Sequence, residues 1–363
     1  MKNRTKSKKA QLAIPFHWIF ILIAGALILI FFISIVFKQK AVSEEKLSAE
    51  LISSIEEIFT GAGVGEDETI HVIDIPKTEF NFICEEESGI SEYSIKGTGV
   101  PRQTPTEIMF SPDLVKGKEL IIWSMPWSMP FKITNFIMIS SSDVRYIIFH
   151  SQAEADFAQQ VKTDMPDPLT VDLVTNINQI PDTGNYKIKF IFIGIDPTTV
   201  DLSILKDKPN KAVSAVRIGS DHVVFYEKQF NIFVQQEKGT VIYLPAYNEK
   251  DAIYFAAMYA ENAEQYRCNL KKILKRLNFV SEIYKDRTLR LQGNYNPNNP
   301  GDICGKLYAV DGFSRLNSVA QDCFDDLDSH LCNYQEFFTA IEGNLGIRER
   351  NMRLQENGCL LIY

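Results

Sequence analysis

Residues 12–37 read LAIPFHWIFILIAGALILIFFISIVF, and the rest of the chain is organised around this stretch. Between Trp18 and Phe37 the positions that are not apolar are Gly25 and Ser34. Fifteen Ile, Leu, Phe or Val residues in this span favour membrane insertion by roughly 5 to 9 kcal/mol. A twenty-residue helix rises about 30 Å, which matches the hydrocarbon core of a bilayer. The stretch therefore predicts a transmembrane helix.

The residues that flank this span predict its orientation. Behind it, Lys38, Lys40 and Lys46 are mixed with Glu44 and Glu45, whereas no acid precedes it. The basic residues ahead of it are Lys2, Arg4, Lys6, Lys8 and Lys9. The positive-inside rule then leaves the amino terminus in the cytoplasm and everything from about residue 41 onward outside. A cleaved secretory signal is the main alternative, but its apolar region is usually shorter and no A-x-A site follows here.

The amino-acid composition indicates which class of partner the chain can bind and in which redox compartment it lies. The net charge is −8, and the basic tail before the membrane makes the external part more acidic still, so we expect no nucleic-acid partner. An even number of cysteines, all beyond the membrane and none in a C-x-x-C pair, favours disulfides over metal ligands. The sequence predicts no metal and no cofactor. The cysteines are Cys84, Cys268, Cys304, Cys323, Cys332 and Cys359.

The pattern along the chain predicts a mixed α+β or α/β fold. The predicted parts are a cytoplasmic basic tail (1–11), the transmembrane helix (12–37), an amphipathic helix with a glycine linker (38–65), a β-rich subdomain (66–143), an α/β subdomain (144–247), and a helical hairpin with the C-terminal segment (248–363).

The first two external parts differ in periodicity. Apolar residues at helical spacing between Ser43 and Phe59 predict a helix that continues the membrane helix and stops at the three glycines 61, 63 and 65. From residue 70 to residue 140, short β-rich runs separated by Pro and Gly predict a small, largely antiparallel sheet.

Between residues 144 and 244 the runs are almost continuously apolar, with a helix candidate at 152–163. This pattern predicts at least one β-α-β unit and a parallel core sheet that is covered on both faces.

The last hundred residues predict two helices, 249–285 and 314–341. Arg267, Lys271, Lys272, Lys275 and Arg276 make part of the first basic, and the second is acidic, so an antiparallel hairpin with complementary charges is one hypothesis. Two solvated faces that never meet are the alternative, since exposed ion pairs contribute about 0 to 1 kcal/mol each.

A hairpin that folds about residue 300 would place Cys268 opposite Cys332, within disulfide reach. The other four cysteines would then form the remaining bridges, with a connectivity that the sequence does not reveal. The alternative is that Cys268 and Cys332 lie on unrelated faces, because Cys268 is off the stripe of Tyr266 and Leu270.

No recognised catalytic motif occurs in the chain. The weak catalytic candidates are His150 and Asp196, which follow two strands of the predicted sheet at the edge where open α/β sheets bind ligands. A general-base role for His150 is one hypothesis. A turn or helix cap at His150 is the simpler interpretation.

The tandem WSMP repeat at 123–130 contains Trp123 and Trp127. Its prolines cannot donate to a sheet ladder, so we expect an edge strand or a bulged crossing. Exposed Trp and Met side chains would suit a protein contact. The alternative is that the two rings fill the interior between layers.

The segment Lys8-Lys9-Ala10-Gln11, followed directly by the apolar span, resembles the class III signal peptide of archaeal type IV pilins and related surface proteins. This resemblance implies cleavage by a prepilin peptidase between Ala10 and Gln11, after which the helix serves as membrane anchor and assembly core. It covers about residues 6–60. Pro15 stands at the fifth position after the cleavage point, where bacterial pilins have a glutamate, and the external part is much larger than that of a major pilin. The resemblance thus implies a minor, tip-located or merely anchored relative. The segment IPFHWIF at 14–20 also resembles the anchors of archaeal membrane proteins.

Together these observations predict a single-pass, membrane-anchored protein of the cell surface that contacts the lipid bilayer and other proteins and is not an enzyme. The resemblance implies a pilus-like assembly as one setting for these contacts. A membrane-tethered enzyme or a ligand-binding receptor that uses the sheet edge near His150 is the alternative hypothesis.

Overall fold

The computed structural model describes residues 13–75, 78–96, 101–180, 184–244, 252–296, 298, 301–327, 332, 334–343 and 345–363, with the backbone alone for 13–17 and 40–48. The predicted cleavage site at Ala10 and Gln11 and the predicted basic tail lie outside these residues. The chain falls into two compact units, Met1–Glu56 and Glu57–Tyr363. Each unit is described by itself.

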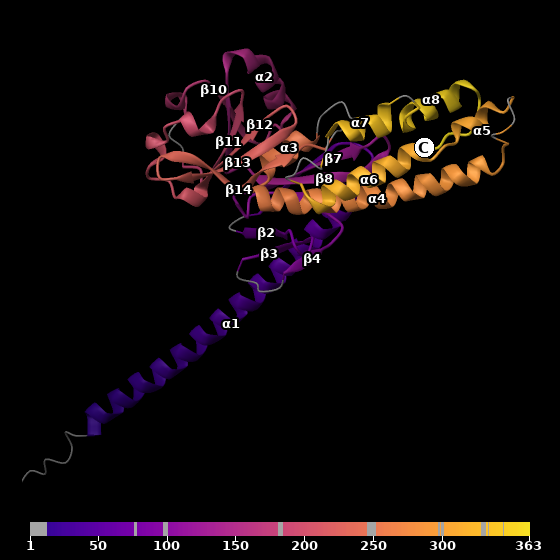
Figure 1. The fold of residues 1–363 in the computed structure, drawn as a ribbon. Coiled ribbons are helices and arrows are strands. Elements are labelled where there is room, and N and C mark those ends of the chain that lie inside the picture. Colours follow the sequence, from indigo (N-terminus) through magenta and orange to yellow (C-terminus); the bar gives the residue numbers. More distant parts are fainter. Residues whose placement is uncertain are drawn as a thin grey trace, which may run out of the picture. The chain divides into compact units, whose positions relative to one another are not determined.

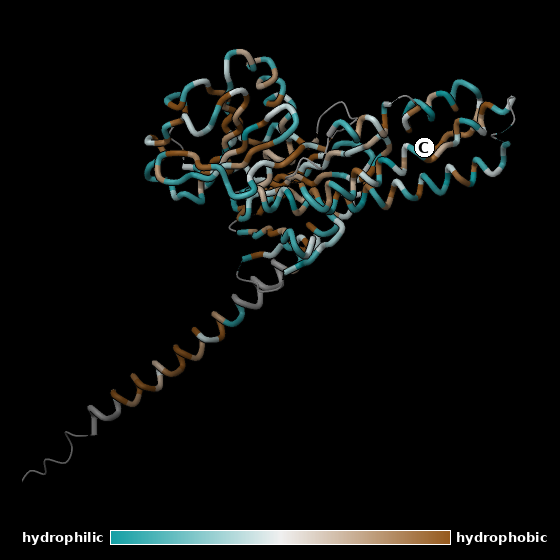
Figure 2. The backbone as a smooth tube through the Cα atoms, viewed as in Figure 1, coloured by the Kyte–Doolittle hydropathy of each residue, from teal (hydrophilic) through white to brown (hydrophobic). Residues whose placement is uncertain are grey.

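The first unit contains most of helix α1 (Ala13–Val64). Its segment Trp18–Gln39 is 22 residues long with a mean hydropathy of 3.2, and none of it is buried in the protein. Figure 2 shows this apolar run as the brown part of α1, and Figure 1 shows the helix. By length and composition the segment can cross a membrane, as an N-terminal signal sequence also can.

The end of α1, which belongs to the second unit, differs from the sequence prediction. The helix does not stop at the first glycine but runs through Gly61 and Gly63 to Val64, and Gly65 N–H still donates to Gly61 O at 3.0 Å. The helix thus ends within the predicted glycine segment, but just before its last glycine and not at its first, because side chains of a neighbouring sheet bind the last carbonyls and stabilise this turn.

The β-rich segment forms two four-stranded sheets (Figure 1). The first has the order β1 (Thr69–Asp74), β7 (Glu119–Ser128), β8 (Lys132–Ser141), β5 (Ile108–Phe110). The second has the order β4 (Arg102–Thr104), β3 (Ile90–Ile95), β2 (Glu79–Glu85), β6 (Leu114–Lys116). All strand pairs are antiparallel except β5 with β8. The segment is thus largely antiparallel as predicted, but it forms two sheets where the sequence predicted one, and the short strands β4 and β6 were not predicted.

The third sheet has six strands in the order β10 (Thr170–Val174), β9 (Val144–His150), β11 (Lys187–Ile193), β12 (Val213–Ile218), β13 (His222–Gln229), β14 (Ile232–Ile242). Strand β9, helix α2 (Ala155–Asp164) and strand β10 form the predicted parallel β-α-β unit. Short 3₁₀ turns at Gln152–Glu154, Ile177–Gln179, Pro197–Thr199, Ser203–Leu205 and Asn210–Ala212 complete this region. Alternate side chains of the strands enter two separate apolar clusters, which confirms that both faces of the sheet are covered.

The C-terminal third is helical: α3 (Ala252–Tyr259), α4 (Ala263–Gln292), α5 (Ile303–Leu307), α6 (Asp311–Asp325), α7 (Tyr334–Glu342) and α8 (Ile347–Glu356). The first predicted helix is divided because Asn262 caps α4, its side chain accepting from the N–H of Gln265. Helices α4 and α6 form the predicted antiparallel hairpin, since Asn317 donates to Glu282 while Lys271 lies 6.0 Å from the ring of Phe324. Both pairs are nearly symmetric about residue 300.

The six cysteines form three disulfides: Cys84–Cys268, Cys304–Cys359 and Cys323–Cys332. The predicted pairing of Cys268 with Cys332 is wrong, although the hairpin register behind it is nearly right. Cys268 lies on the face of α4 that meets strand β2, 5.9 Å from Cys84 between Cα atoms. The helix face, not the register along the axis, therefore decides its partner.

Trp123 and Trp127 are both fully buried, which contradicts the exposed protein contact and agrees with the alternative that the two rings fill the interior. Trp123 packs against Phe255, and Trp127 stacks on Phe136. Pro126 lies beyond the last residue of β7 that pairs with β1, and a bulge follows at Trp127. Proline has no N–H to donate, and Pro126 lies in the part of β7 that is not paired with β1.

Candidate functional site

At the predicted edge of the six-stranded sheet, His150 and Asp196 each bind nearby residues of the chain. His150 ends β9, and its Nδ1 lies 2.9 Å from the carbonyl oxygen of Ser151. Asp196 caps the turn Pro197–Thr199 and accepts from the N–H and the hydroxyl of Thr198, at 3.0 and 2.8 Å. These hydrogen bonds lower the pKa of Asp196. Within the described part of the chain, no hydrogen bond or ion pair joins His150 to Asp196.

A different place in the second unit has the features of a binding site. A cavity of about 690 Å³ is lined by the end of α1 (60–64), the β2–β3 turn (86–90), residues 105–108, residues 134–137 of β8, residues 271–279 of α4, and Phe324 of α6. We call it the α4 groove. Its volume is within the range of about 300 to 1,000 Å³ that is usual for small-molecule sites.

The end of α1 forms one wall because strands β7 and β8 supply donors for its carbonyls. Asn135 Nδ2 donates to the carbonyl oxygens of Ala62 and Gly65 at 2.6 and 2.8 Å, and Ser124 donates to Ala62 O at 2.7 Å. The ammonium of Lys132 binds Gly65 O as well. A cation and amide donors at a helix C-terminus satisfy carbonyls that the helix leaves unpaired.

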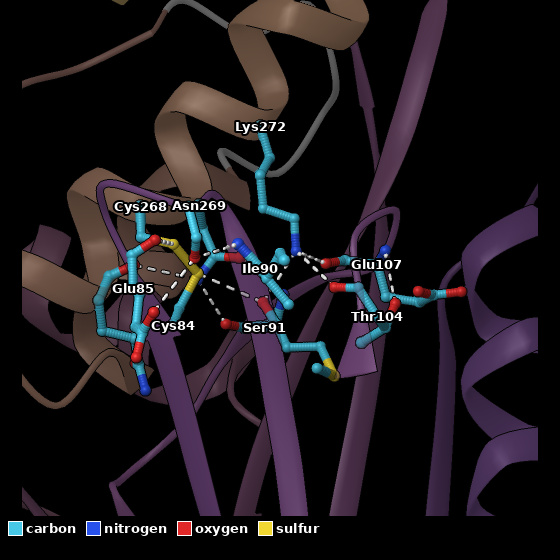
Figure 3. The surroundings of a disulfide bond; sticks show 12 residues. Cys84, Glu85, Ile90, Ser91, Thr104, Glu107, Cys268, Asn269 and Lys272 are labelled. Atoms are coloured by element: carbon cyan, nitrogen blue, oxygen red, sulfur yellow. Dashed lines mark hydrogen bonds between the residues drawn. A yellow bond between two sulfur atoms is a disulfide. The ribbon is translucent and has the colours of Figure 1, made fainter. Parts of the chain in front are cut away.

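The β2–β3 turn forms another wall and is tied to α4. The disulfide Cys84–Cys268 joins them covalently (Figure 3). Glu86 in the turn pairs with Arg267 at 2.9 Å and with Lys271 at 2.8 Å. Although burial works in the opposite direction, the hydrogen bonds from these two cations lower the pKa of Glu86. The turn is therefore fixed against the helix at adjacent positions.

Lys272 is the third tie between α4 and this sheet (Figure 3). Its buried ammonium donates to Ser91 Oγ at 2.8 Å and to the carbonyl oxygens of Thr104 and Glu107 at 3.3 and 2.5 Å. Burial lowers the pKa of Lys272 to about 8. Because its three donors serve three protein acceptors, Lys272 holds the groove together and has no proton left for a ligand.

Asn269, one turn before, binds strand β5 in the way that a neighbouring strand would. Its Oδ1 accepts from Met109 N–H at 3.1 Å and its Nδ2 donates to Met109 O at 2.7 Å. Strand β5 and helix α4 are thus held in one register, which fixes the floor of the groove.

Other polar groups of the groove are not used by the fold. Asn135 is 1% exposed, and its Oδ1 has no hydrogen-bond partner among the described residues. Lys275 and Arg276 line the groove, and no hydrogen bond or ion pair joins them to the described part of the chain. Beside them, Phe279 is 67% exposed. The groove therefore presents two cations and an apolar wall, and the unused acceptor of Asn135 is buried beneath its lining.

A second and larger cleft, of about 1,210 Å³, lies at the amino ends of β11 and β12, and most of the residues that line it are of polar or charged types. Its buried charges serve each other. Lys187 pairs with Glu261, and Lys189 donates to the carbonyl oxygens of Ala260 and Glu261 at 2.6 and 3.2 Å. Burial lowers the pKa of Lys189 to about 8. Loss of hydration and the Glu261 carboxylate raise the pKa of Asp113 to about 6, although part of this residue reaches solvent.

The sequence contained a signal for each cavity. The basic residues of α4 were noticed but assigned to the acidic second helix, whereas Arg267 and Lys271 in fact pair with Glu86 of the β2–β3 turn. Lysines 187 and 189 alternate in an otherwise apolar strand, which indicates a charged patch on one face. The sequence does not indicate a role for Asn135, because its hydrogen-bond partners are carbonyl groups at the end of α1.

Among the described residues, no group of three or more His, Cys, Asp or Glu side chains could hold a metal ion. Comparison with protein-family models, with curated proteins and with solved structures found no match.

Proposed function

We propose that this chain is a single-pass membrane protein whose residues from about 41 onward lie outside the cytoplasm and act by binding other molecules. One observation carries the proposal. All six cysteines follow the apolar span, and all six are in disulfides. Disulfides persist in oxidising compartments and are rare in the cytosol, so the cysteines favour an external location for the second unit.

The amino terminus then remains in the cytoplasm. The basic residues before the span and the mixed charges behind it support this orientation. Surface binding is proposed over catalysis because the polar groups at the predicted sheet edge bind their own neighbours, whereas the α4 groove offers free groups of the kind that recognise a ligand. A pilin-like role is a narrower form of the same proposal and depends on cleavage after Ala10.

Mass spectrometry of the mature amino terminus tests the anchor. A start at Met1 supports a plain anchor, and a start at Gln11 supports pilin-type processing with the helix retained. A start beyond Phe37 would show that the helix is a removed signal sequence and would overturn the anchor.

Protease digestion of intact spheroplasts tests the orientation. We expect the second unit to be cleaved from outside without lysis. As a control, the five basic residues before the span are replaced by Gln, which weakens the positive-inside signal and is expected to protect a fraction of the chains. Full protection of the unaltered chain would contradict the proposed orientation.

A further inference from the structure

Asn135 in the α4 groove has an acceptor that the fold leaves unused. The amide orientation is fixed because Nδ2 donates to two carbonyl oxygens, those of Ala62 and Gly65, which cannot donate in return. The acceptor Oδ1 is buried and lacks a partner in the described residues. A buried acceptor without a donor costs free energy, which a ligand with an N–H or O–H group would recover.

Two cations lie at the same groove. Lys275 is exposed and Arg276 half-buried on α4, one turn beyond the tie made by Lys272. Burial and, as a smaller contribution, the charge of Arg276 lower the pKa of Lys132, although Glu66 opposes this shift. Lys132 shares the carbonyl oxygen of Gly65 with Asn135, so Arg276 acts on the end of the groove where the unused acceptor lies.

Of the nearby carboxylates, Glu66 and Asp67 act on Lys132 at this end, whereas the three that line the groove lie on other segments. Glu86 is engaged by Arg267 and Lys271. The carboxylate of Glu107 accepts from the hydroxyl of Thr106 at 2.9 Å, and its charge acts on Lys272. Glu87, the third, is exposed on the β2–β3 turn, across the groove from α4. Positive charge therefore collects on the α4 side.

The remaining lining is apolar and partly open to solvent. Phe279 and Val64 are 67% and 71% exposed, and Ile90 and Phe324 are half-buried. Exposed aromatic and aliphatic side chains around a cavity favour a ligand with an apolar body.

We propose that the α4 groove binds a small amphiphilic anion: a carboxylate or phosphate held by Arg276 and Lys275, a hydrogen-bond donor that meets Asn135 Oδ1, and an apolar body against Phe279. Guanidinium binds carboxylate and phosphate through paired hydrogen bonds, which gives the site its preference for an anion. The cavity volume of the groove suits a small molecule and not a polymer.

The test uses the full chain in nanodiscs of uncharged lipid, with empty nanodiscs as the blank. The probes are 3-phenylpropanoate, the neutral 3-phenylpropanamide, and 3-phenyllactate, which adds a hydroxyl donor beside the carboxylate. Binding is followed by isothermal titration calorimetry. We expect 3-phenylpropanoate to bind at about millimolar concentration or below, the amide at least about tenfold more weakly, and phenyllactate more tightly than either.

Variants locate the binding. The double variant Lys275→Gln with Arg276→Gln should weaken the two anions about tenfold and leave the amide unchanged. Arg290→Gln, an exposed cation on the same helix outside the groove, is the matched control and should change nothing. Thermal melting confirms that each variant is folded. Equal binding of acid and amide, or anion binding that the double variant does not weaken, would overturn the proposal. Absence of binding by every probe, with an acidic peptide bound instead, would also overturn it in favour of a protein partner.

The same chemistry could come from a free molecule or from a lipid monomer. Nanodiscs that contain an anionic phospholipid separate the two sources. Weaker binding of 3-phenylpropanoate in these discs, with the double variant insensitive to the lipid, would identify a lipid ligand, whereas unchanged binding would identify a soluble one.

Discussion

The edge of the six-stranded sheet and the α4 groove both contain polar side chains of the kinds found in binding sites. At the sheet edge these side chains bind neighbouring residues, whereas in the groove some of them are left without a partner in the part of the chain that the structure describes. At the sheet edge, His150 and Asp196 bind the chain within two residues of themselves. In the groove, the acceptor of Asn135 and the cation of Arg276 are left without a partner among the described residues. The comparison teaches that a candidate site is better recognised by polar groups that the fold leaves unused than by residue type or by position in a familiar topology.

The α4 groove is held together by contacts between segments that are distant in sequence, whereas the sheet edge is held by hydrogen bonds between near neighbours. Two of its walls come from segments far apart in sequence, β2–β3 and α4, and three ties hold them together: a disulfide, the pairing of Glu86 with two cations, and Lys272. Breaking these ties should therefore have larger effects than breaking the local caps at the sheet edge.

The largest effect is expected for the disulfide between the walls. Replacing Cys84 and Cys268 by Ala should lower the free energy of unfolding by about 5 kcal/mol, because the bridge spans 184 residues. The matched control replaces Cys323 and Cys332, which are 9 residues apart, and should cost about 3 kcal/mol in the same chain-entropy model. Denaturant unfolding of the full chain in detergent measures both. A smaller loss for the first pair than for the second would contradict the structure's account of the walls.

The second effect concerns the interior of the sheet that forms the groove floor. Trp127→Ala should destabilise the chain by about 3 to 5 kcal/mol, because the ring is fully buried against Phe136. Phe279→Ala, which removes an exposed aromatic ring, is the control and should change stability by less than about 0.5 kcal/mol. If Trp127→Ala leaves stability unchanged while a protein partner is lost, the exposed-contact interpretation of the WSMP repeat is restored.

Periodicity explains which parts of the fold were predictable from sequence. Strands β9 and β11 were found because each is an almost continuously apolar run that the sheet buries on both faces, and the hairpin α4–α6 because its apolar residues recur at helical spacing. The break at Asn262 and the continuation of α1 past Gly61 were missed, because a single cap or a few donors from β8 decide them. Tertiary contacts override local preference at these points.

The candidate site was less predictable than the fold. Cys268 could be placed along the hairpin, but its partner depends on which face of α4 meets β2, and no pattern in residues 79–85 indicates that sheet's position. The unused acceptor of Asn135 arises where β8 meets the end of α1. A site made by three segments that are distant in sequence is defined by their packing, which no single stretch encodes.

The third effect is expected for Lys272→Met. The variant leaves the acceptors of Ser91, Thr104 and Glu107 without their donor and should cost about 1 to 3 kcal/mol at neutral pH. The exposed Lys275→Met is the control and should have little effect.

The same variant tests the pH dependence. The pKa of Lys272 is about 8 in the folded chain and about 10.5 when unfolded, so between these values the unfolded chain binds more protons. Stability of the unaltered chain should therefore rise from pH 8 to pH 10. The rise should be smaller in Lys272→Met, where Lys189 still contributes with the same sign. An identical rise in both chains would show that Lys272 is not buried as a cation.

The smallest effect is expected at the sheet edge. Asp196→Ala removes the acceptor for Thr198 and should cost about 0.5 kcal/mol, at the low end for a cap because the group is exposed and the turn is short. Since the pKa of Asp196 is lowered in the folded chain, its contribution is present at neutral pH and is lost as the pH falls through that value. Asp196→Asn keeps an acceptor and should be nearly neutral at all pH values, which makes it the matched control. Urea unfolding at pH 7 and at pH 3 separates the two variants. If Asp196→Asn instead leaves stability intact but removes binding of a ligand, the sheet edge is a site after all, and a polar group that binds its neighbours in the free protein can exchange them for a ligand.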